Sequence, residues 1–327
     1  MTRGADMNTP ESARPPEKKY LVDRLGLFLC LVAVMAVVSF IILSLPYENT
    51  YIRESGVSDY YVRIFAVMAA AVSVIFVAGL FYNAMIWMEG KIDGERDLPR
   101  TRKLLISIGR LLKAVFSRDF GRHLRAFIID SLLLRKLWRT NKMRWLMHAL
   151  IYFGFLGIFF LDLIATAALE IFHTDAFIDP NGWGKLWIRD FGFDLFGLMV
   201  LIGLIGATVR RFVFRPKQLM TGQEDFLAIV LLLIVVVGGF VQEGVGMSSG
   251  LPSHASPDAY SFVGAFFASF LPAVSNAVYS QLWFVHAVAS LALIAYIPFS
   301  KLFHLFAAPL AIHIDEIIRG REKTSAR

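Results

Sequence analysis

Cysteine is nearly absent from this chain: among 327 residues there is one, Cys30. A disulfide needs two cysteines, and a thiolate metal site or an iron–sulfur cluster needs several. A single cysteine therefore excludes all three within this chain. Any iron–sulfur chemistry connected with this protein must sit on another subunit.

Charge is missing from long stretches of the sequence. No Asp, Glu, Lys or Arg occurs between Asp258 and Lys301, and Leu25–Tyr47 and Ile64–Met88 are equally free of charge. Apolar runs of about 20 residues are long enough to cross the ~30 Å hydrocarbon layer of a bilayer. The chain is 57% hydrophobic and its mean hydropathy is +0.59, which excludes an ordinary soluble domain.

The apolar runs predict an all-α, polytopic membrane helix bundle with six transmembrane helices. Three further runs reach spanning length once their polar flanks are included: Trp145–Leu161, Leu195–Val209 and Phe226–Val241. The run Ala259–Ser300 is too long for one span, so we expect an interfacial piece, a break near Pro272 and then the final span. The short alternating segments of a membrane β-barrel are missing, which leaves helices as the spanning form.

Positive charge is almost missing from the loops on one side. Of the 33 Lys and Arg residues, 28 lie in residues 1–24, 89–147, 209–225 and 310–327, and three lie in the alternate loops. Because cytoplasmic loops are enriched in Lys and Arg, this asymmetry places both termini in the cytoplasm, in a bacterial-type inner membrane. We expect an anionic lipid surface and a cytoplasmic protein as partners of these cations, and no nucleic acid.

Five regions follow from this pattern. They are a cytoplasmic tail at 1–24, the first two spans within 25–88, a basic cytoplasmic segment at 89–144, a four-helix core at 145–309 and a cytoplasmic tail at 310–327. No small-residue cleavage site follows the first apolar run, so we expect a retained span. In the basic segment, apolar residues from Leu104 to Val115 recur at helical spacing. They predict an amphipathic helix that lies on the inner membrane surface or forms a docking platform for a soluble subunit.

Two histidines stand near the ends of the last apolar run. His286 and His304 are 18 residues apart, which at ~100° per residue places both side chains on one helix face, about 27 Å apart along the axis. Ionisable residues inside a membrane are usually functional. An imidazole near each end of one spanning helix is the arrangement that two haems, one near each side of a bilayer, require.

The other histidines supply the available partners. His148 opens the third span on the inner side, where the antiparallel last span places His304, so these two imidazoles can meet across one haem. On the outer side, the partner of His286 must be His173 or His254. His173 lies 25 residues after His148 and falls within ~20° of the same face, but its axial offset would be ~37 Å, against ~27 Å for the other pair.

Three carboxylates lie near the outer ends of the predicted spans. Asp162 is 14 residues after His148 and lies ~40° from the same helix face. It is either a functional group, for proton transfer or a haem hydrogen bond, or a carboxylate that reaches the interface. Asp190 and Asp194, at the start of the fourth span, are interpreted as interfacial side chains.

Several stretches resemble a known family. PFSKLFHLFAAP at 298–309, with a histidine 18 residues before its own, resembles the last span of the gamma subunits of respiratory nitrate reductase, which are dihaem cytochrome b quinol oxidases. VRRFVFRPK at 209–217 and GFLGIFFLD at 154–162 are similar to that family's basic inner turn and second helix. RWLMHALIYFGF at 144–155 is closer to one branch, the gamma-like subunits of heterodisulfide-reductase-type and dissimilatory-sulfite-reductase-associated membrane complexes.

The resemblance implies haem ligands. It makes His148 and His304 the ligands of an inner haem b, and His286 a ligand of an outer one. The family's second histidine on the third span has no counterpart here, because its place falls at or near Asp162. Either His173 substitutes for it, or the outer site is altered, or a single haem is bound.

The resemblance also implies a quinone site beside the outer haem. Lys185 is the nearest match to a basic residue that the family keeps there. We expect a quinone such as menaquinone to bind between His286, Asp162 and the loop 173–190, with Lys185 polarising a quinone oxygen. The alternative is that Lys185 serves as an interface anchor between two tryptophans.

The implied function is that of a cytochrome b subunit that exchanges electrons between the quinone pool and a cytoplasmic, heterodisulfide-reductase-like iron–sulfur subunit of a respiratory complex. Such a chain oxidises quinol or reduces quinone, and it is not a complete enzyme alone. Arg210 and Arg211 match the family's inner basic pair and either hold haem propionates or act as ordinary positive-inside residues. The rival classes are a proton-coupled transporter and a haem-free membrane anchor. The transporter is disfavoured because paired interrupted helices and a two-fold repeat are missing.

Overall fold

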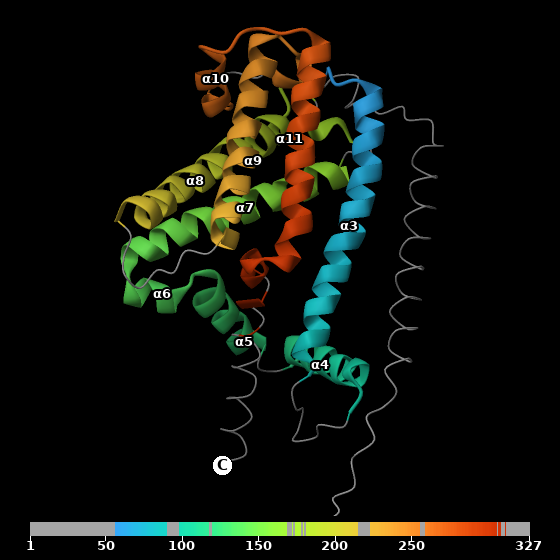
Figure 1. Cartoon of the computed structure of the whole chain (residues 1–327), viewed down its shortest axis with the longest axis vertical. Helices are drawn as coiled ribbons and strands as arrows, with labels where there is room; N and C mark the ends of the chain where they lie inside the picture. The colour runs from blue at the N-terminus through green and yellow to red at the C-terminus, as the bar shows by residue number, and fades with distance from the viewer. Residues whose placement is uncertain are drawn as a thin grey trace, which may run out of the picture.

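The computed structural model describes residues 56–89, 98–117, 120–168, 181–214, 223–255 and 259–305, with a few positions between 172 and 179 and between 307 and 311. In this part of the chain the regular elements are helical and no strand occurs. The long helices are α3 (Asp59–Trp87), α7 (Lys142–Thr166), α8 (Phe191–Thr208), α9 (Gln223–Ser248) and α11 (Asn276–Tyr296). Figure 1 shows α3, α11 and α9 running alongside one another, with the α7–α8 pair crossing them.

Within the residues that the structure describes, five helical segments are long and apolar enough to cross a membrane. They are Asp59–Trp87, Lys142–Ala165, Gly184–Phe214, Asp225–Ser248 and Asn276–Phe299. They coincide with the second to sixth predicted spans. The first predicted span, Leu25–Tyr47, lies outside the described residues, so the count of six and the placement of the termini stay predictions. Below, the end of the bundle that carries His148 is called the inner end and the end that carries Lys185 the outer end, following the predicted orientation.

The basic segment contains three short helices, α4 (Arg100–Val115), α5 (Phe120–Ala126) and α6 (Arg135–Thr140), with a π-helical turn, η1 (Phe127–Leu132), between the last two. The predicted amphipathic helix is confirmed as α4. Leu105, Ile108 and Leu112 are exposed on it, and their spacing gathers them on one face. That apolar stripe is available to a lipid surface or to a partner protein, and its contact with either stays a prediction.

Helices α7 and α8 approach each other closely at small residues. A Cβ atom on Gly154 of α7 would lie 2.7 Å from the Phe196 carbonyl oxygen, and one on Gly203 of α8 would lie 3.0 Å from the Met147 carbonyl oxygen. Glycine at such positions lets the backbones of two membrane helices pack together. The pairing brings the inner end of α7 against the inner end of α8, which continues into a π-helical turn, η5 (Val209–Phe214).

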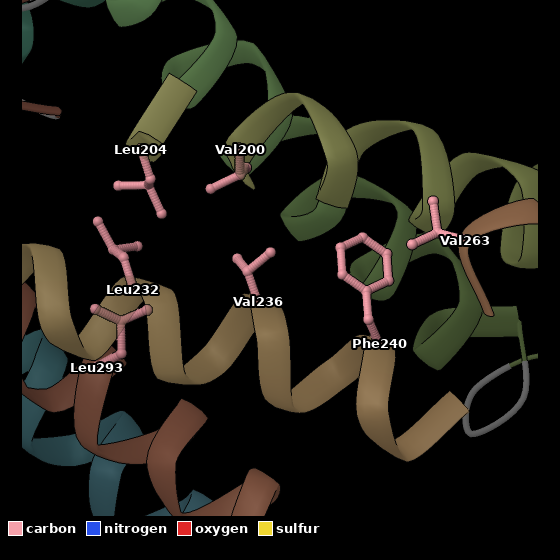
Figure 2. Close-up of a cluster of buried hydrophobic side chains, with 7 residues drawn as sticks. All are labelled: Val200, Leu204, Leu232, Val236, Phe240, Val263 and Leu293. Carbon is pink, nitrogen blue, oxygen red and sulfur yellow. The ribbon is translucent and has the colours of Figure 1, made fainter. Parts of the chain in front are cut away.

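The hydrophobic core joins α8 to the later helices. Figure 2 shows side chains of α8, α9, α11 and the start of α10 (Phe262–Ala268) pointing toward one another. The cluster consists of Val200, Leu204, Leu232, Val236, Phe240, Val263 and Leu293. Because α9 lies between α8 and α11, its packing sets how the inner ends of α7 and α11 are placed.

The predicted break near Pro272 is confirmed. Helix α10 ends at Ala268 and α11 begins at Asn276. The Ser275 side chain accepts a hydrogen bond from the Val278 N–H at 3.4 Å, which caps the start of α11. The interfacial piece and the last span are therefore separate helices.

The last span is not one regular helix, so the expectation of a continuous turn pattern from His286 to His304 was wrong. Helix α11 ends at Tyr296 and two 3-10 turns follow, η7 (Ile297–Phe299) and η8 (Lys301–Phe303). Pro298 lacks an N–H and its ring clashes with the preceding turn, which ends the α-helix. Asn83 of α3 compensates by donating to the Pro298 carbonyl oxygen at 2.8 Å.

Candidate functional site

Two histidines meet at the inner end of the bundle. His148 lies in the second turn of α7, which Asn141 caps by accepting a hydrogen bond from the Arg144 N–H at 2.9 Å. His304 directly follows η8. The two ring centroids lie 5.8 Å apart and the ring planes differ by 23°. The structure therefore brings together the two imidazoles that the topology placed on the inner side.

The second ring nitrogen of His304 already has a partner. Nδ1 of His304 lies in hydrogen-bonding contact with the Lys301 carbonyl oxygen. A carbonyl only accepts, so Nδ1 must carry a proton, and Nε2 is the ring nitrogen that can serve as a metal ligand. Metal-bound histidines commonly donate their other N–H in this way, which fixes the tautomer and the ring direction. The 3-10 turn after Pro298 supplies this carbonyl.

A basic cavity opens beside His148. Its volume is about 350 Å³. The side chains around it are those of Leu137, Arg144, Met147, His148, Ile151, Ala207, Arg210, Arg211 and Ile229. Arg210 and Arg211 are the two arginines singled out from the sequence, whereas Arg144 was not expected to share their cavity. Three guanidinium groups in one apolar-walled cavity suit a ligand that carries carboxylates.

An acidic residue that sequence reasoning missed connects this cavity to His304. The Asp225 carboxylate lies 3.4 Å from the Arg211 guanidinium and 3.1 Å from the Lys301 ammonium. Asp225 opens the fifth predicted span, and a carboxylate at that position was a signal that went unused. Through these two ion pairs, Asp225 connects η5, which carries Arg211, to the segment that positions His304.

These residues fit the haem b that the resemblance implies. Metal–imidazole bonds are about 2 Å long and the ring centre lies roughly 1 Å further out, so two imidazoles on opposite sides of one iron have centroids roughly 6 Å apart. The His148–His304 separation agrees with that spacing. The neighbouring arginines match the two propionates that haem b carries.

The outer histidine of the last span faces helix α9. The His286 ring lies against Gly238 and Gly239, where added Cβ atoms would come within 3.2 and 3.5 Å of it. Its Nδ1 atom is buried and has no hydrogen-bond partner among the described residues. The proposed partner His173 lies outside the described residues, so the second ligand of an outer haem stays a prediction.

A buried ion pair lies at the outer end. The Lys185 ammonium, in the π-helical turn η4 (Gly184–Asp190), lies 2.8 Å from the Asp190 carboxylate. Lys185 is 0% exposed, so the alternative of an interface anchor was wrong. The interfacial interpretation of Asp190 and Asp194 was also wrong, because both side chains are buried inside the bundle. Buried charges require partners, and Lys185 and Asp190 serve as each other's partner within η4.

Asp194 is held by the start of a neighbouring helix. Its Oδ2 atom accepts hydrogen bonds from the N–H groups of Val263 at 2.6 Å and Gly264 at 3.4 Å. The carboxyl group of Glu243, near the end of α9, lies beside that of Asp194. Sequence reasoning missed Glu243, although an acidic residue directly after an apolar span was a usable signal.

His254 is paired with a tyrosine rather than solvated. Its Nε2 atom lies 2.6 Å from the Tyr279 hydroxyl oxygen, which also accepts from the Gln242 amide at 3.4 Å. Burial, together with the positive charges of Arg189 and Lys185, lowers the pKa of His254 to about 3. The imidazole is therefore neutral at physiological pH.

Asp162 lies on α7 with an exposed side chain, beside the exposed apolar residues Phe159 and Leu163. No hydrogen bond or ion pair links it to Lys185 or His286 in the described part of the chain. Its place beside a bound quinone stays a prediction.

Comparison with known proteins decides the family. The profile of HdrE, a subunit of dihydromethanophenazine:CoB–CoM heterodisulfide reductase, matches residues 124–312. The chain belongs to this family. The HdrE protein of Methanosarcina acetivorans is 28% identical over 278 residues, which cover 79% of this chain and 94% of that one. The HdrE protein of Methanosarcina mazei is 28% identical over 277 residues, covering 79% and 96%.

A second kind of relative shares part of the chain. The EtfAB:quinone oxidoreductase of Syntrophomonas wolfei is 30% identical over 179 residues, which cover 50% of this chain and 24% of that protein. No solved structure matches this chain. The matched family consists of subunits of an oxidoreductase complex, and the apolar helices agree with a multi-pass membrane protein that takes part in electron transfer.

Proposed function

We propose that this chain is a cytochrome b subunit that exchanges electrons between a quinone-like carrier in the membrane and a cytoplasmic iron–sulfur partner. The observation that carries the proposal is the His148–His304 pair. The two rings face each other across 5.8 Å, and one of them has its second nitrogen held by a backbone carbonyl. A pair of ordinary structural histidines does not require both features.

The residues of the inner end each have a task in this proposal. His148 and His304 are the axial ligands, and the Lys301 carbonyl sets the tautomer of His304. Arg144, Arg210 and Arg211 hold the propionates from the walls of the shared cavity. Haem b with two imidazole ligands supplies one-electron transfer and has no open coordination position. The surrounding arginines balance the charge of the propionates.

The outer end is the proposed place of the carrier. The names of the methanogen relatives specify dihydromethanophenazine, and the name of the Syntrophomonas relative specifies a quinone. Both are lipid-soluble two-electron carriers, so we assign that class of reactant here. His286 is the proposed ligand of an outer haem b with His173 as its partner, and Lys185, held by Asp190, is the proposed cation beside the carrier.

The cytoplasmic partner is proposed to dock on the basic inner face. Arg139 on α6 is exposed, and Arg135 is only partly neutralised by an exposed ion pair with Asp130. One cysteine cannot hold clusters, so electrons at the inner end need an acceptor or donor on another chain. A complementary acidic surface on an iron–sulfur subunit fits this requirement.

The visible spectrum of the purified protein tests the proposal. We expect a reduced-minus-oxidised haem b spectrum in the wild type and a clear loss of signal in His148→Ala and His304→Ala. His123→Ala, in the basic segment, is the matched control and should keep the full signal. A wild-type protein without haem would leave the transporter or the haem-free anchor as the function, and full haem content in both ligand variants would reject the ligand pair.

A further inference from the structure

The outer end holds two carboxyl groups in direct contact. Asp194 comes from the start of α8 and Glu243 from the end of α9, and their carboxyl groups lie close enough to share a hydrogen bond. Asp194 is 0% exposed. The Glu243 carboxyl group also lies beside Ser261, and the missing side chain of Gly264 makes room for it, because a Cβ there would lie 2.6 Å from Cδ of Glu243.

One oxygen of Asp194 depends on this contact. Its Oδ2 atom accepts hydrogen bonds from the N–H groups of Val263 and Gly264 at the start of α10. Its Oδ1 atom is buried, and no N–H or hydroxyl of the described residues donates to it. A buried acceptor without a donor is costly, and an ionised Glu243 has no proton to give. Two ionised carboxylates in contact also repel each other. Both problems disappear if Glu243 carries a proton and donates it to Asp194.

We propose that Asp194 and Glu243 share one proton and that this pair is a proton-transfer site at the outer end of the bundle. The pair has a defined donor and acceptor, and its backbone contacts hold Asp194 in place whether or not the proton is present. If Asp194 only capped the start of α10, Glu243 would be unnecessary. The presence of Glu243 therefore distinguishes the pair from a simple helix cap.

The charges around the pair agree with one shared proton. Lys185, Arg189 and Asp190 come from η4, Glu243 comes from α9, and His254 comes from the 3-10 turn η6 (Pro252–His254). Helix α10 contributes no charged side chain. Asp190 lies near the pair, and Lys185 and Arg189 lie near His254. With His254 neutral, this set holds two cations and three carboxyl groups, and one shared proton makes it neutral. An additional uncompensated charge at a buried position would be expensive.

The role of this pair in proton transfer rests on the proposed function. Oxidation of one quinol releases two electrons and two protons. The electrons leave one at a time toward the haem b of the proposed function, and the protons leave one at a time through the carboxyl pair. Accepting a proton makes both carboxyl groups neutral, and releasing one to outer water restores the shared state.

The shared proton is tested without any haem. Infrared spectra of the purified protein should contain the C=O band of a protonated carboxyl group that shifts in D2O. We expect Glu243→Gln and Asp194→Asn to remove this band, Glu243→Asp to retain it, and the exposed control Asp59→Asn to leave it unchanged. A band of wild-type intensity in both Glu243→Gln and Asp194→Asn would overturn the shared proton.

Proton transfer is tested by the rate at which a quinol analogue, duroquinol, reduces the bound haem. Glu243→Gln should slow this rate by about tenfold or more, with haem content and dithionite reduction unchanged, and Glu243→Asp should restore most of it. An unchanged rate in Glu243→Gln and Asp194→Asn would overturn the transfer role while leaving the cytochrome function intact. A wild-type protein that duroquinol does not reduce would reject the quinone function, and the infrared band would still decide the shared proton.

Discussion

The imidazole rings of His148 and His304 lie 5.8 Å apart, although one comes from the start of α7 and the other from the segment after the proline break in the last span. Their meeting depends on two contacts. Close packing of α7 on α8 places the first ring, and the 3-10 turns after Pro298 place the second. The predictions below test the groups that hold this pair and the groups at the opposite end of the bundle.

The arginines around the inner cavity should help to retain the bound haem and should raise its midpoint potential. We expect Arg210→Ala and Arg144→Ala each to weaken haem retention by roughly 10-fold or more, since a hydrogen bond to a charged group contributes about 1.5–3 kcal/mol. The midpoint potential should shift to more negative values, because a nearby positive charge favours the reduced iron. Haem content and redox titration measure both effects. Arg139→Ala, exposed and outside the cavity, is the control, and equal behaviour of all three variants would contradict the propionate role.

His286 should hold a second haem. We expect two haems per chain in the wild type and one in His286→Ala, with the spectrum of the His148 pair preserved. His173→Ala should behave like His286→Ala if it supplies the opposite ligand. A count of one haem in the wild type would reject the outer site, and two haems in His173→Ala would transfer the second ligand to another residue.

Gly79 should be needed for the contact between α3 and the proline turn. A Cβ atom there would lie 2.5 Å from Cβ of Pro298, so Gly79→Ala should force the helices apart and destabilise the protein by about 1–3 kcal/mol. Thermal unfolding in detergent measures this loss. Gly109→Ala is the matched control, because nothing lies within 4 Å of its added Cβ atom and alanine favours a helix by about 1 kcal/mol. Similar losses in both variants would exclude a steric cause at Gly79.

His254 should make stability depend on pH. The folded protein holds its pKa at about 3, whereas an unfolded chain binds the proton near pH 6.5, so unfolding takes up a proton between these values. The contribution to stability is therefore complete above about pH 6.5 and is lost as the pH falls toward 3, by at most ~1.4 kcal/mol per pH unit. Thermal midpoints should fall less steeply with acid in His254→Gln than in the wild type. Parallel pH profiles would show that the histidine titrates normally.

The basic inner face should bind its partner through charge. We expect Arg135→Glu combined with Arg139→Glu to weaken copurification of an iron–sulfur subunit. Higher salt should weaken the wild-type association in the same direction, since salt screens exposed charges. The substitution Glu89→Lys at an exposed position adds positive charge to this segment instead of removing it, and it serves as the control of opposite sign. Association that is indifferent to both changes and to salt would confine the segment to contact with lipid.

Much of the architecture was predictable because its causes are local. Uncharged runs long enough to cross a bilayer predicted the five spans found in the described residues. The break near Pro272 and the helix from Arg100 to Val115 followed from proline chemistry and from apolar spacing. The meeting of His148 with His304 followed from antiparallel spans, because residues at facing ends of neighbouring helices need no detailed packing to come close.

The errors concern positions where packing overrides local pattern. Pro298 ended the helix that was expected to continue to His304, and the donor that stabilises the turn is Asn83 from a distant helix. Lys185, Asp190 and Asp194 sit near the ends of apolar runs, where side chains usually reach water, yet all three are buried. Their burial depends on α9 and α10 covering the start of α8, which spacing along the chain does not reveal.

The sequence by itself determined the helical spans of the described residues and the histidines near the ends of two of them, because hydropathy, charge and proline act over a few residues. Tertiary structure decided which polar groups share a site. It joined Asp225 to Arg211 and Lys301, and it brought Glu243 beside Asp194. The physical reason is that a carboxylate inside a bundle is tolerated only with a partner, and which partner it meets depends on how the helices pack.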